Sequence, residues 1–248
     1  MKNRHPVHLV AITGGSGAGK TWLAERLQTV LGDNAARLSL DNFYRDRSDL
    51  PPARREKINF DDPRAIDWPC VEQVLRQCRP GQVTPVPRYD FTTHTRLREP
   101  QLWEPKSLIL MDGLWLLHRR SIRRLFALRI FIDCPEALRL RRRLDRDVCE
   151  RGRSESSVRQ QFQATVAPMH ERFVAPQATH ADVTLTQPVT GSAVHQLADR
   201  MWNLLLLDSQ LEDQFEALQT AGSGIQTWMQ ADFRTQISAL FRSGSPSL

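Results

Sequence analysis

The sequence GGSGAGKT at residues 14–21 is the segment whose residue types most clearly specify a chemistry. Glycines let a backbone curl tightly enough for several N–H groups to converge on one phosphate, and a following helix adds the positive end of its dipole. The segment matches G-x-x-x-x-G-K-[ST] in full, so Lys20 is expected to reach the β- and γ-phosphates and Thr21 to coordinate Mg²⁺. The predicted phosphate-binding residues are Gly14, Gly15, Ser16, Gly17, Ala18, Gly19, Lys20 and Thr21.

This phosphate loop predicts only nucleotide binding, but two aspartates point to phosphoryl transfer. Asp41 follows one apolar run directly, and Asp112 follows another, at residues 108–111. A kinase needs a carboxylate to orient or accept the proton of the attacking hydroxyl, and acidic ligands for its metal. Asp41 is therefore the candidate base, and Thr21, Asp41 and Asp112 are the candidate Mg²⁺ ligands. Taken alone, a strand-end aspartate is explained about equally well as a cap or turn residue.

Short apolar runs alternating with helical patterns predict the elements that position these residues. The predicted strands are residues 7–13, 36–40, 107–111, 128–133 and 181–186, and the predicted helices are residues 20–31, about 69–79 and 192–207. This alternation indicates an α/β fold, with a five-stranded parallel sheet flanked by helices on both faces. Ligands bind such sheets beyond the carboxyl ends of the strands, where the loop, Asp41 and Asp112 are expected to meet.

Beyond the loop, an ordered series of segments over about residues 7–205 resembles the uridine kinases. The matching segments are residues 39–46 (SLDNFYRD), 59–67 (NFDDPRAID), 87–96 (PRYDFTTHTR), 111–114 (MDGL) and 142–153 (RRLDRDVCERGR). The resemblance implies a P-loop NTPase fold with an inserted substrate region at about 43–105 and an arginine-rich lid at about 139–160. It also implies that ATP or GTP, with Mg²⁺, phosphorylates the 5′-hydroxyl of uridine or cytidine, as in pyrimidine salvage.

The resemblance also implies roles for individual residues. It makes Asp41 the catalytic base and directs Asp61 to the ribose hydroxyls. Tyr89, Phe91 and His94 are implied to contact the pyrimidine. The residue chemistry agrees, because an aromatic face can stack on a base and a histidine can hydrogen-bond to its edge.

Arginines crowd residues 139–159, and two interpretations compete for them. The acidic residues among them allow a solvated helix with ion pairs at i,i+4 spacing. Alternatively, the segment is a mobile lid whose planar guanidinium donors close over the phosphates. The resemblance favours the lid, with Arg143 and Arg146 as catalytic phosphate contacts, Arg153 as a substrate contact and Gln161 near the nucleoside.

Some residues depart from the uridine kinase pattern. Asp112 stands where those kinases usually carry glutamate, and the shorter acid is expected to hold Mg²⁺ through water. Trp68 and Trp115 are bulky residues expected close to the substrate pocket. The alternative is therefore a related P-loop kinase that phosphorylates a phosphorylated pentose, pantothenate or another nucleoside.

Length and composition predict one large domain with an appendage. At 248 residues, with 40% hydrophobic and 25% charged residues, the chain has the profile of a globular protein. We expect a nucleoside-kinase-like domain at residues 1–207 and a helical extension of unknown role at 208–248. The four cysteines show no metal-ligand spacing and no C-x-x-C pair, which indicates reduced thiols and a cytoplasmic location.

The net charge of +6 also allows an NTP-dependent nucleic-acid-binding protein. Against that class, aromatic residues make up only 7% of the chain, and no RNA-binding motif is visible. A regulatory protein that binds ATP without catalysis is disfavoured by the joint presence of Lys20, Asp41 and Asp112. The expected partner is a small nucleoside, with no nucleic acid and no membrane, and the resemblance implies a homo-oligomer.

Overall fold

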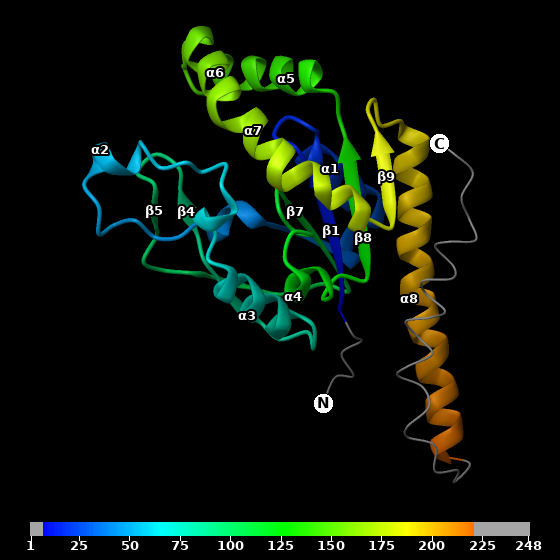
Figure 1. The fold of residues 1–248 in the computed structure, drawn as a ribbon. Coiled ribbons are helices and arrows are strands. Elements are labelled where there is room, and N and C mark those ends of the chain that lie inside the picture. The colour runs from blue at the N-terminus through cyan, green and yellow to red at the C-terminus, as the bar shows by residue number, and fades with distance from the viewer. Residues whose placement is uncertain (1–6, 221–248) are drawn as a thin grey trace. The chain divides into compact units, whose positions relative to one another are not determined.

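The computed structural model describes residues 7–220 of the chain (Figure 1). The chain divides into two compact units, with the boundary between Met201 and Trp202 inside helix α8 (Gly191–Thr220). Within the predicted extension, residues 208–220 belong to α8, and residues 221–248 lie outside the described part. No helix within residues 7–220 is long and apolar enough to cross a membrane.

A five-stranded parallel sheet with the order β2–β7–β1–β8–β9 forms the centre of the first unit. Its strands are β1 (His8–Gly14), β2 (Ala35–Ser39), β7 (Leu108–Gly113), β8 (Leu128–Asp133) and β9 (Val183–Thr186). Every residue of β1 and β7 is buried, as expected for strands covered on both faces. The five predicted strands and their parallel arrangement are confirmed, with ends that shift by one or two residues.

The register of the sheet brings the predicted site residues to one edge. Asp112 pairs with Ile12 of β1 on one side and with Ser39 of β2 on the other. The phosphate loop therefore begins at Gly14, beside the end of β7. Asp112 is the fifth residue of β7 and lies within the strand, whereas the sequence suggested that it follows the strand.

Helices cover both faces of the sheet. Helix α1 (Lys20–Leu31) begins on the last residues of the phosphate loop and packs on β1, β2 and β7, as predicted. Figure 1 shows α1 behind the sheet and a helical segment around α7 in front of it. That segment comprises η4 (Phe162–Val166), α7 (Ala167–Met169), η5 (His170–Val174) and η6 (Ala175–His180).

The chain between β2 and β7 forms the region that the sequence predicted as an insert. Its helical elements are η2 (Leu40–Phe43), α2 (Pro52–Arg55), η3 (Pro63–Ala65) and α3 (Trp68–Cys78), while the short η1 (Gly32–Asn34) links α1 to β2. Its strands form two antiparallel pairs, β3 (Thr84–Val86) with β6 (Gln101–Trp103), and β4 (Tyr89–Asp90) with β5 (Thr95–Arg96). The sequence predicted α3 but not these strands, because two or three residues are too few to show a period.

After β7 the chain forms α4 (Arg120–Arg123), α5 (Glu136–Cys149) and α6 (Glu155–Gln161). Helix α5 buries Arg139, Arg143 and Asp147, which are four residues apart and so share one face. A fully solvated charged helix is therefore the wrong interpretation for this face of α5. The face packs on the phosphate loop, where a Cβ atom added to Gly17 would lie 2.5 Å from the Arg139 carbonyl oxygen.

Candidate active site

A cavity of about 1200 Å³ opens beyond the carboxyl ends of β1, β2 and β7. Gly14, Gly15 and Ala18 of the phosphate loop are buried and do not line it in the described structure. Every other residue predicted for the site lines this cavity. They are Ser16, Gly17, Gly19, Lys20, Thr21, Asp41, Asp61, Tyr89, Phe91, His94, Asp112, Arg143, Arg146, Arg153 and Gln161.

The phosphate loop has the backbone geometry of an anion cradle. Gly17 and Gly19 have φ angles of 79° and 92°, which lie in the left-handed region that glycine adopts without strain. Gly19 stands directly before α1, so the N-terminus of that helix faces the loop. The Lys20 ammonium donates to the Gly15 carbonyl oxygen at 2.8 Å, which folds the lysine back over the loop. This arrangement suits the binding of a triphosphate.

Lys20, Asp41 and Asp112 form an electrostatically coupled group at the end of the loop. Burial lowers the pKa of Lys20, although the Asp112 and Asp41 carboxylates oppose the shift. Burial also raises the pKa of Asp41, with the Lys20 ammonium opposing and Asp112 reinforcing the shift. Asp41 is the second residue of the η2 turn, where its N–H donates to the Ser39 hydroxyl at 3.3 Å. A partly desolvated carboxylate beside a phosphate site is suited to accept a proton.

Oxygen donors suited to Mg²⁺ meet beside this group. The Thr21 hydroxyl donates to Asp112 Oδ2 at 3.0 Å, and Asp41 lies close enough to interact with Asp112. No three His, Cys, Asp or Glu side chains form a metal-binding group anywhere in residues 7–220. Mg²⁺ does not require one, because it usually takes one or two carboxylates and fills its shell with phosphate oxygens and water. The three predicted ligands therefore fit a magnesium site completed by substrate.

Aromatic rings line another wall of the cavity. Phe60 stacks on His94 with ring centroids 4.5 Å apart, and Tyr44 lies 5.3 Å from Tyr89 and 6.4 Å from Phe91. The Tyr89 hydroxyl and His94 Nδ1 are buried, and neither has a hydrogen-bond partner among the described residues. Buried polar atoms rarely lack a partner. A planar ligand with polar edges would both stack on these rings and satisfy those two atoms.

Asp61 lies apart from the phosphate loop, near the start of the insert. Burial raises the pKa of its carboxyl group, and the Arg143 guanidinium opposes that shift. The Thr165 hydroxyl contacts Asp61 Oδ2 at 3.5 Å, which joins the insert to the helical segment after α6. The position suits a carboxylate that accepts hydrogen bonds from sugar hydroxyls.

Arginines of the predicted lid form a third wall. Arg143 donates to the Ser16 hydroxyl of the phosphate loop and to Gln161 Oε1, at 3.0 Å in each case. Arg153 donates to the same Gln161 oxygen at 2.7 Å. Arg146 also lines the cavity. Guanidinium groups around a phosphate loop can bind phosphate oxygens and offset the charge that develops during transfer.

Sequence reasoning did not single out Trp22, Tyr44, Phe60 and Arg142, which also line the cavity. Tyr44 and Phe60 are near neighbours of Asp41 and Asp61 in the chain, and an aromatic residue beside each candidate acid was the available signal. Arg142 could not be distinguished among so many arginines. In the structure its guanidinium donates to the Gly17 carbonyl oxygen at 3.4 Å.

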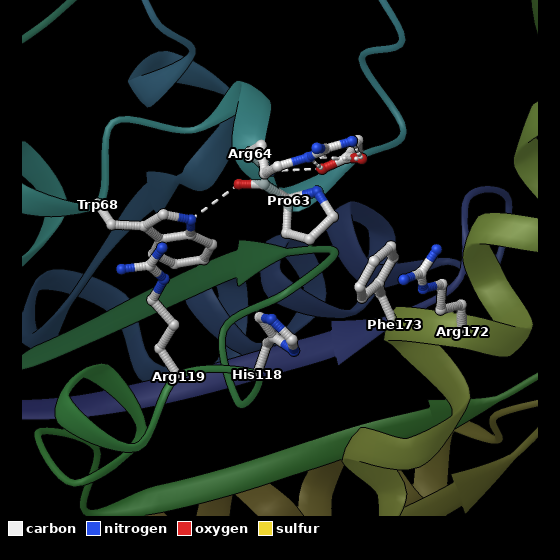
Figure 2. A pocket seen from close by; sticks show the side chains of 8 residues that line it. Pro63, Arg64, Trp68, His118, Arg119, Arg172 and Phe173 are labelled. Atoms are coloured by element: carbon white, nitrogen blue, oxygen red, sulfur yellow. Dashed lines mark hydrogen bonds and ion pairs between the residues drawn. The ribbon is translucent and has the colours of Figure 1, made fainter.

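A smaller pocket of about 310 Å³ lies elsewhere and shares no lining residue with the cavity within residues 7–220. Figure 2 shows Trp68 in its wall, where the indole N–H donates to the Pro63 carbonyl oxygen and Arg119 lies against the ring. Trp115 is fully buried. The prediction that both tryptophans crowd the substrate pocket is therefore wrong, because both rings pack into the hydrophobic core.

Comparison with known proteins gives a consistent result. The model of the phosphoribulokinase/uridine kinase family matches residues 9–192. A uridine kinase of Halobacterium salinarum is 34% identical over 196 residues, which cover 79% of this chain and 87% of that protein. A uridine kinase of Chloroflexus aurantiacus is 40% identical over 176 residues, which cover 71% of this chain and 84% of that protein.

Solved structures show the same fold at low sequence identity. A putative fructose transport system kinase from Silicibacter has a TM-score of 0.61 at 19% identity, covering 75% of this chain and 92% of that one. Phosphoribulokinase from Rhodobacter spheroides has a TM-score of 0.55 at 17% identity, covering 75% of this chain and 71% of that one. The P-loop kinase fold is therefore shared across proteins whose names differ in the phosphate acceptor.

Proposed function

The chain belongs to the phosphoribulokinase/uridine kinase family, and we propose that it transfers the γ-phosphate of ATP to the 5′-hydroxyl of a pyrimidine nucleoside such as uridine. Its relatives at 34% and 40% identity carry the name uridine kinase. The segments that resemble those enzymes provide the walls of the cavity, which supports the same choice of acceptor.

One observation carries the proposal: Asp41 lines the same cavity as Lys20 of the phosphate loop and Tyr44 of the aromatic wall. Its carboxylate is close enough to interact electrostatically with both side chains. A triphosphate held by the loop and a nucleoside stacked on the rings would therefore meet at Asp41. In-line phosphoryl transfer requires this proximity of base, acceptor and donor.

The proposed mechanism assigns each wall a task. Tyr89, Phe91 and His94 hold the pyrimidine, and Asp61 accepts hydrogen bonds from the ribose hydroxyls. Asp41 accepts the proton of the 5′-hydroxyl while the 5′-oxygen of the nucleoside forms a bond to the γ-phosphorus of ATP. The bond between the γ-phosphorus and the oxygen of the β-phosphate breaks at the same time, and ADP leaves. Lys20, Arg143 and Arg146 stabilise the charge on the transferring group. Arg153 and Gln161 contact the nucleoside from the lid.

The donor set of Thr21, Asp41 and Asp112 supports a magnesium ion as cofactor. When bound, Mg²⁺ supplies charge neutralisation to the β- and γ-phosphates. Of this set, the Thr21 hydroxyl and the Asp112 carboxylate are already in contact. Asp41 would serve both as a ligand of the metal and as the base for the acceptor hydroxyl.

A substrate screen tests the proposal. Purified protein, ATP and Mg²⁺ are incubated with uridine, cytidine, purine nucleosides, pantothenate and a phosphorylated pentose, and ADP release is coupled to product identification by mass spectrometry. We expect uridine or cytidine monophosphate. The proposal would be overturned if the enzyme phosphorylated only pantothenate or the pentose, or if it phosphorylated none of the nucleosides. Repeating the screen with GTP establishes the donor.

We further propose that the enzyme acts in the cytoplasm as a homo-oligomer. The cysteines Cys70, Cys78, Cys134 and Cys149 are all free thiols in the structure, which suits a reducing compartment. Self-association rests on the resemblance to uridine kinases alone. Light scattering of the purified protein tests it, and a monomer at micromolar concentration would contradict it.

A further inference from the structure

The lid arginines share one buried carboxylate that belongs to Asp147. Side-chain nitrogens of Arg146, Arg151, Arg143 and Arg153 lie 2.8, 3.3, 3.4 and 3.4 Å from its oxygens, respectively. Asp147 is fully buried. All four arginines line the cavity, whereas Asp147 lies outside the lining that the described residues form. The carboxylate is therefore behind the arginines, on the side away from the substrates.

We propose that Asp147 is a positioning residue that assembles these four arginines into a phosphate clamp before ATP binds. The proposal rests on the proposed function, since the clamp acts on the phosphates of that reaction. Asp147 itself would touch neither nucleotide nor nucleoside.

The charges around Asp147 support an arginine cluster that can bind a further anion. A buried carboxylate is costly unless it is paired, and Asp147 is paired with more cations than it can neutralise. Asp61 also interacts with Arg143, so two carboxylates face four guanidiniums, which still leaves an excess of positive charge. Phosphate groups are the anions that the adjoining loop is built to hold.

Part of the hydrogen-bonding capacity of the arginines also remains free, most of all in Arg146 and Arg151, whereas Arg143 and Arg153 already donate to Ser16, Gln161 and Ser157. Each guanidinium has five N–H donors, and the closest approach to Asp147 uses one nitrogen of each. The side chains of Arg146, Arg151 and Arg153 keep 36%, 56% and 31% of their surface exposed. Donors therefore remain available to phosphate oxygens while Asp147 fixes where the guanidiniums lie.

Asp147 also closes the turn between α5 and α6. The Arg153 N–H donates to the Asp147 carbonyl oxygen at 3.1 Å, and Gly152 has a left-handed φ of 63°. This turn brings Arg151 and Arg153 back toward Arg143, which lies on α5 one helical turn before Asp147. Backbone and side chain of a single residue thus gather arginines from both sides of the turn. With a neutral or positively charged side chain at position 147, the guanidiniums would repel one another and move apart.

The test compares Asp147→Asn with Asp145→Asn, which makes the same charge change on the same helix at an exposed residue. We expect Asp147→Asn to lower kcat by about ten- to hundredfold, because small misplacements of catalytic groups cost this much. Asp145→Asn should stay within twofold of wild type. Rates are measured per folded enzyme, well below the melting temperature, so that a purely structural role would leave kcat unchanged. Asp147→Glu keeps the charge and should recover part of the lost rate.

Hydrogen exchange on the wild-type enzyme supplies a readout that needs neither turnover nor a variant. A preassembled clamp predicts slow exchange of the Arg153 amide without nucleotide. Exchange at the rate of an unstructured peptide would overturn the proposal, as would a kcat for Asp147→Asn equal to that of Asp145→Asn. If Asp147→Asn fails to fold, the exchange result decides alone. If the wild-type enzyme phosphorylates no nucleoside, the proposed function is wrong, but the exchange rate of the Arg153 amide still tests whether the arginines are held in place without nucleotide.

Discussion

Burial penalises the ionised form of the Asp41 carboxylate. Burial raises its pKa, and the Lys20 ammonium offsets only part of that shift. Asp61 shows the same raised pKa from burial. Carboxylates placed where the protein penalises their charge are typical of catalytic and binding sites.

Replacing the proposed base separates catalysis from binding. Asp41→Asn should lower kcat by about 10²- to 10⁴-fold, the usual contribution of general base catalysis, while ATP binding persists. Steady-state kinetics and calorimetric titration with a non-hydrolysable ATP analogue measure the two effects. Asp49→Asn, at an exposed position in the same segment, is the matched control. Turnover by Asp41→Asn near the wild-type rate would refute the assignment.

The same substitution has a predicted effect on stability that depends on pH. Because the folded-state pKa of Asp41 is raised, its stabilising contribution is complete below the unfolded value of 3.8 and is lost as pH rises through the folded value. At pH 7 burial penalises the charged carboxylate, so ligand-free Asp41→Asn should have a Tm no lower than that of the wild type. The Tm should be higher if losing the attraction to Lys20 costs less than the burial penalty that the substitution removes. The difference in Tm between variant and wild type should shrink as the pH falls toward 4. Thermal melts across this range measure it, and a large loss of Tm at pH 7 would contradict it.

Replacing His94 should weaken the binding of the nucleoside and leave the binding of ATP unchanged. Its φ of 56° is left-handed, which asparagine tolerates, so His94→Asn removes the ring without adding backbone strain. We expect the KM for uridine to rise about tenfold, equivalent to about 1.4 kcal/mol, with the KM for ATP unchanged. Equal effects on both substrates would contradict the assignment. His118→Ala, at a residue in the wall of the smaller pocket, serves as the control.

The pKa of His94 adds a pH test of the same contact. Burial lowers this pKa below 6.5, although Glu56 and Asp90 oppose the shift. The imidazole therefore protonates at a lower pH than an ordinary histidine. The wild-type KM for uridine should accordingly rise at a lower pH than protonation of an ordinary histidine would predict. Kinetics in a constant-ionic-strength buffer series measure this profile.

At the scale of elements, the end of β7 and the η2 turn are packed directly against each other. A Cβ atom added to Gly113 would lie 2.5 Å from Leu40 Cβ, and Leu40 is fully buried beside Asp41. Gly113→Ala should therefore destabilise the fold by about 1–3 kcal/mol and displace Asp41, lowering kcat as well. Chemical denaturation measures the first effect. Gly191→Ala, which meets no atom within 4 Å, should be neutral, and equal stability of both variants would contradict the prediction.

At the scale of the whole molecule, the proposed division is a kinase domain at residues 1–207 and an extension at 208–248. The residues that line the cavity in the described structure lie between Ser16 and Gln161, and the family model ends at residue 192. A chain ending at residue 207 should therefore keep kcat and both KM values within about threefold. Activity assays and analytical gel filtration measure this.

A shorter truncation provides the matched control. Helix α8 buries Val194, Leu197, Ala198 and Met201, which lie on one face at helical spacing. A chain ending at Thr190 loses this face and should be insoluble or unfolded, because each large apolar residue contributes about 1.5–3 kcal/mol when buried. If the chain ending at 207 folds but is inactive, the extension takes part in catalysis and the proposed division fails.

The sequence by itself determined the features that depend on local spacing. The phosphate loop, helix α1 and the five strands follow from glycine positions and apolar periodicity within short windows. The parallel sheet follows from strands buried on both faces, and it places Asp41 and Asp112 beside the loop. Tyr89, Phe91 and His94 came from the family resemblance, since their spacing alone carried no signal.

Only the tertiary structure decided which side chains meet across long separations in the chain. Among many arginines and interspersed acids, packing buries Asp147 and turns four arginines toward the cavity. It joins Thr165 to Asp61, and it packs Trp68 into the hydrophobic core, outside the lining of the cavity. Charge and residue type are local properties, whereas burial and convergence depend on how distant segments pack, and no short window of sequence contains that information.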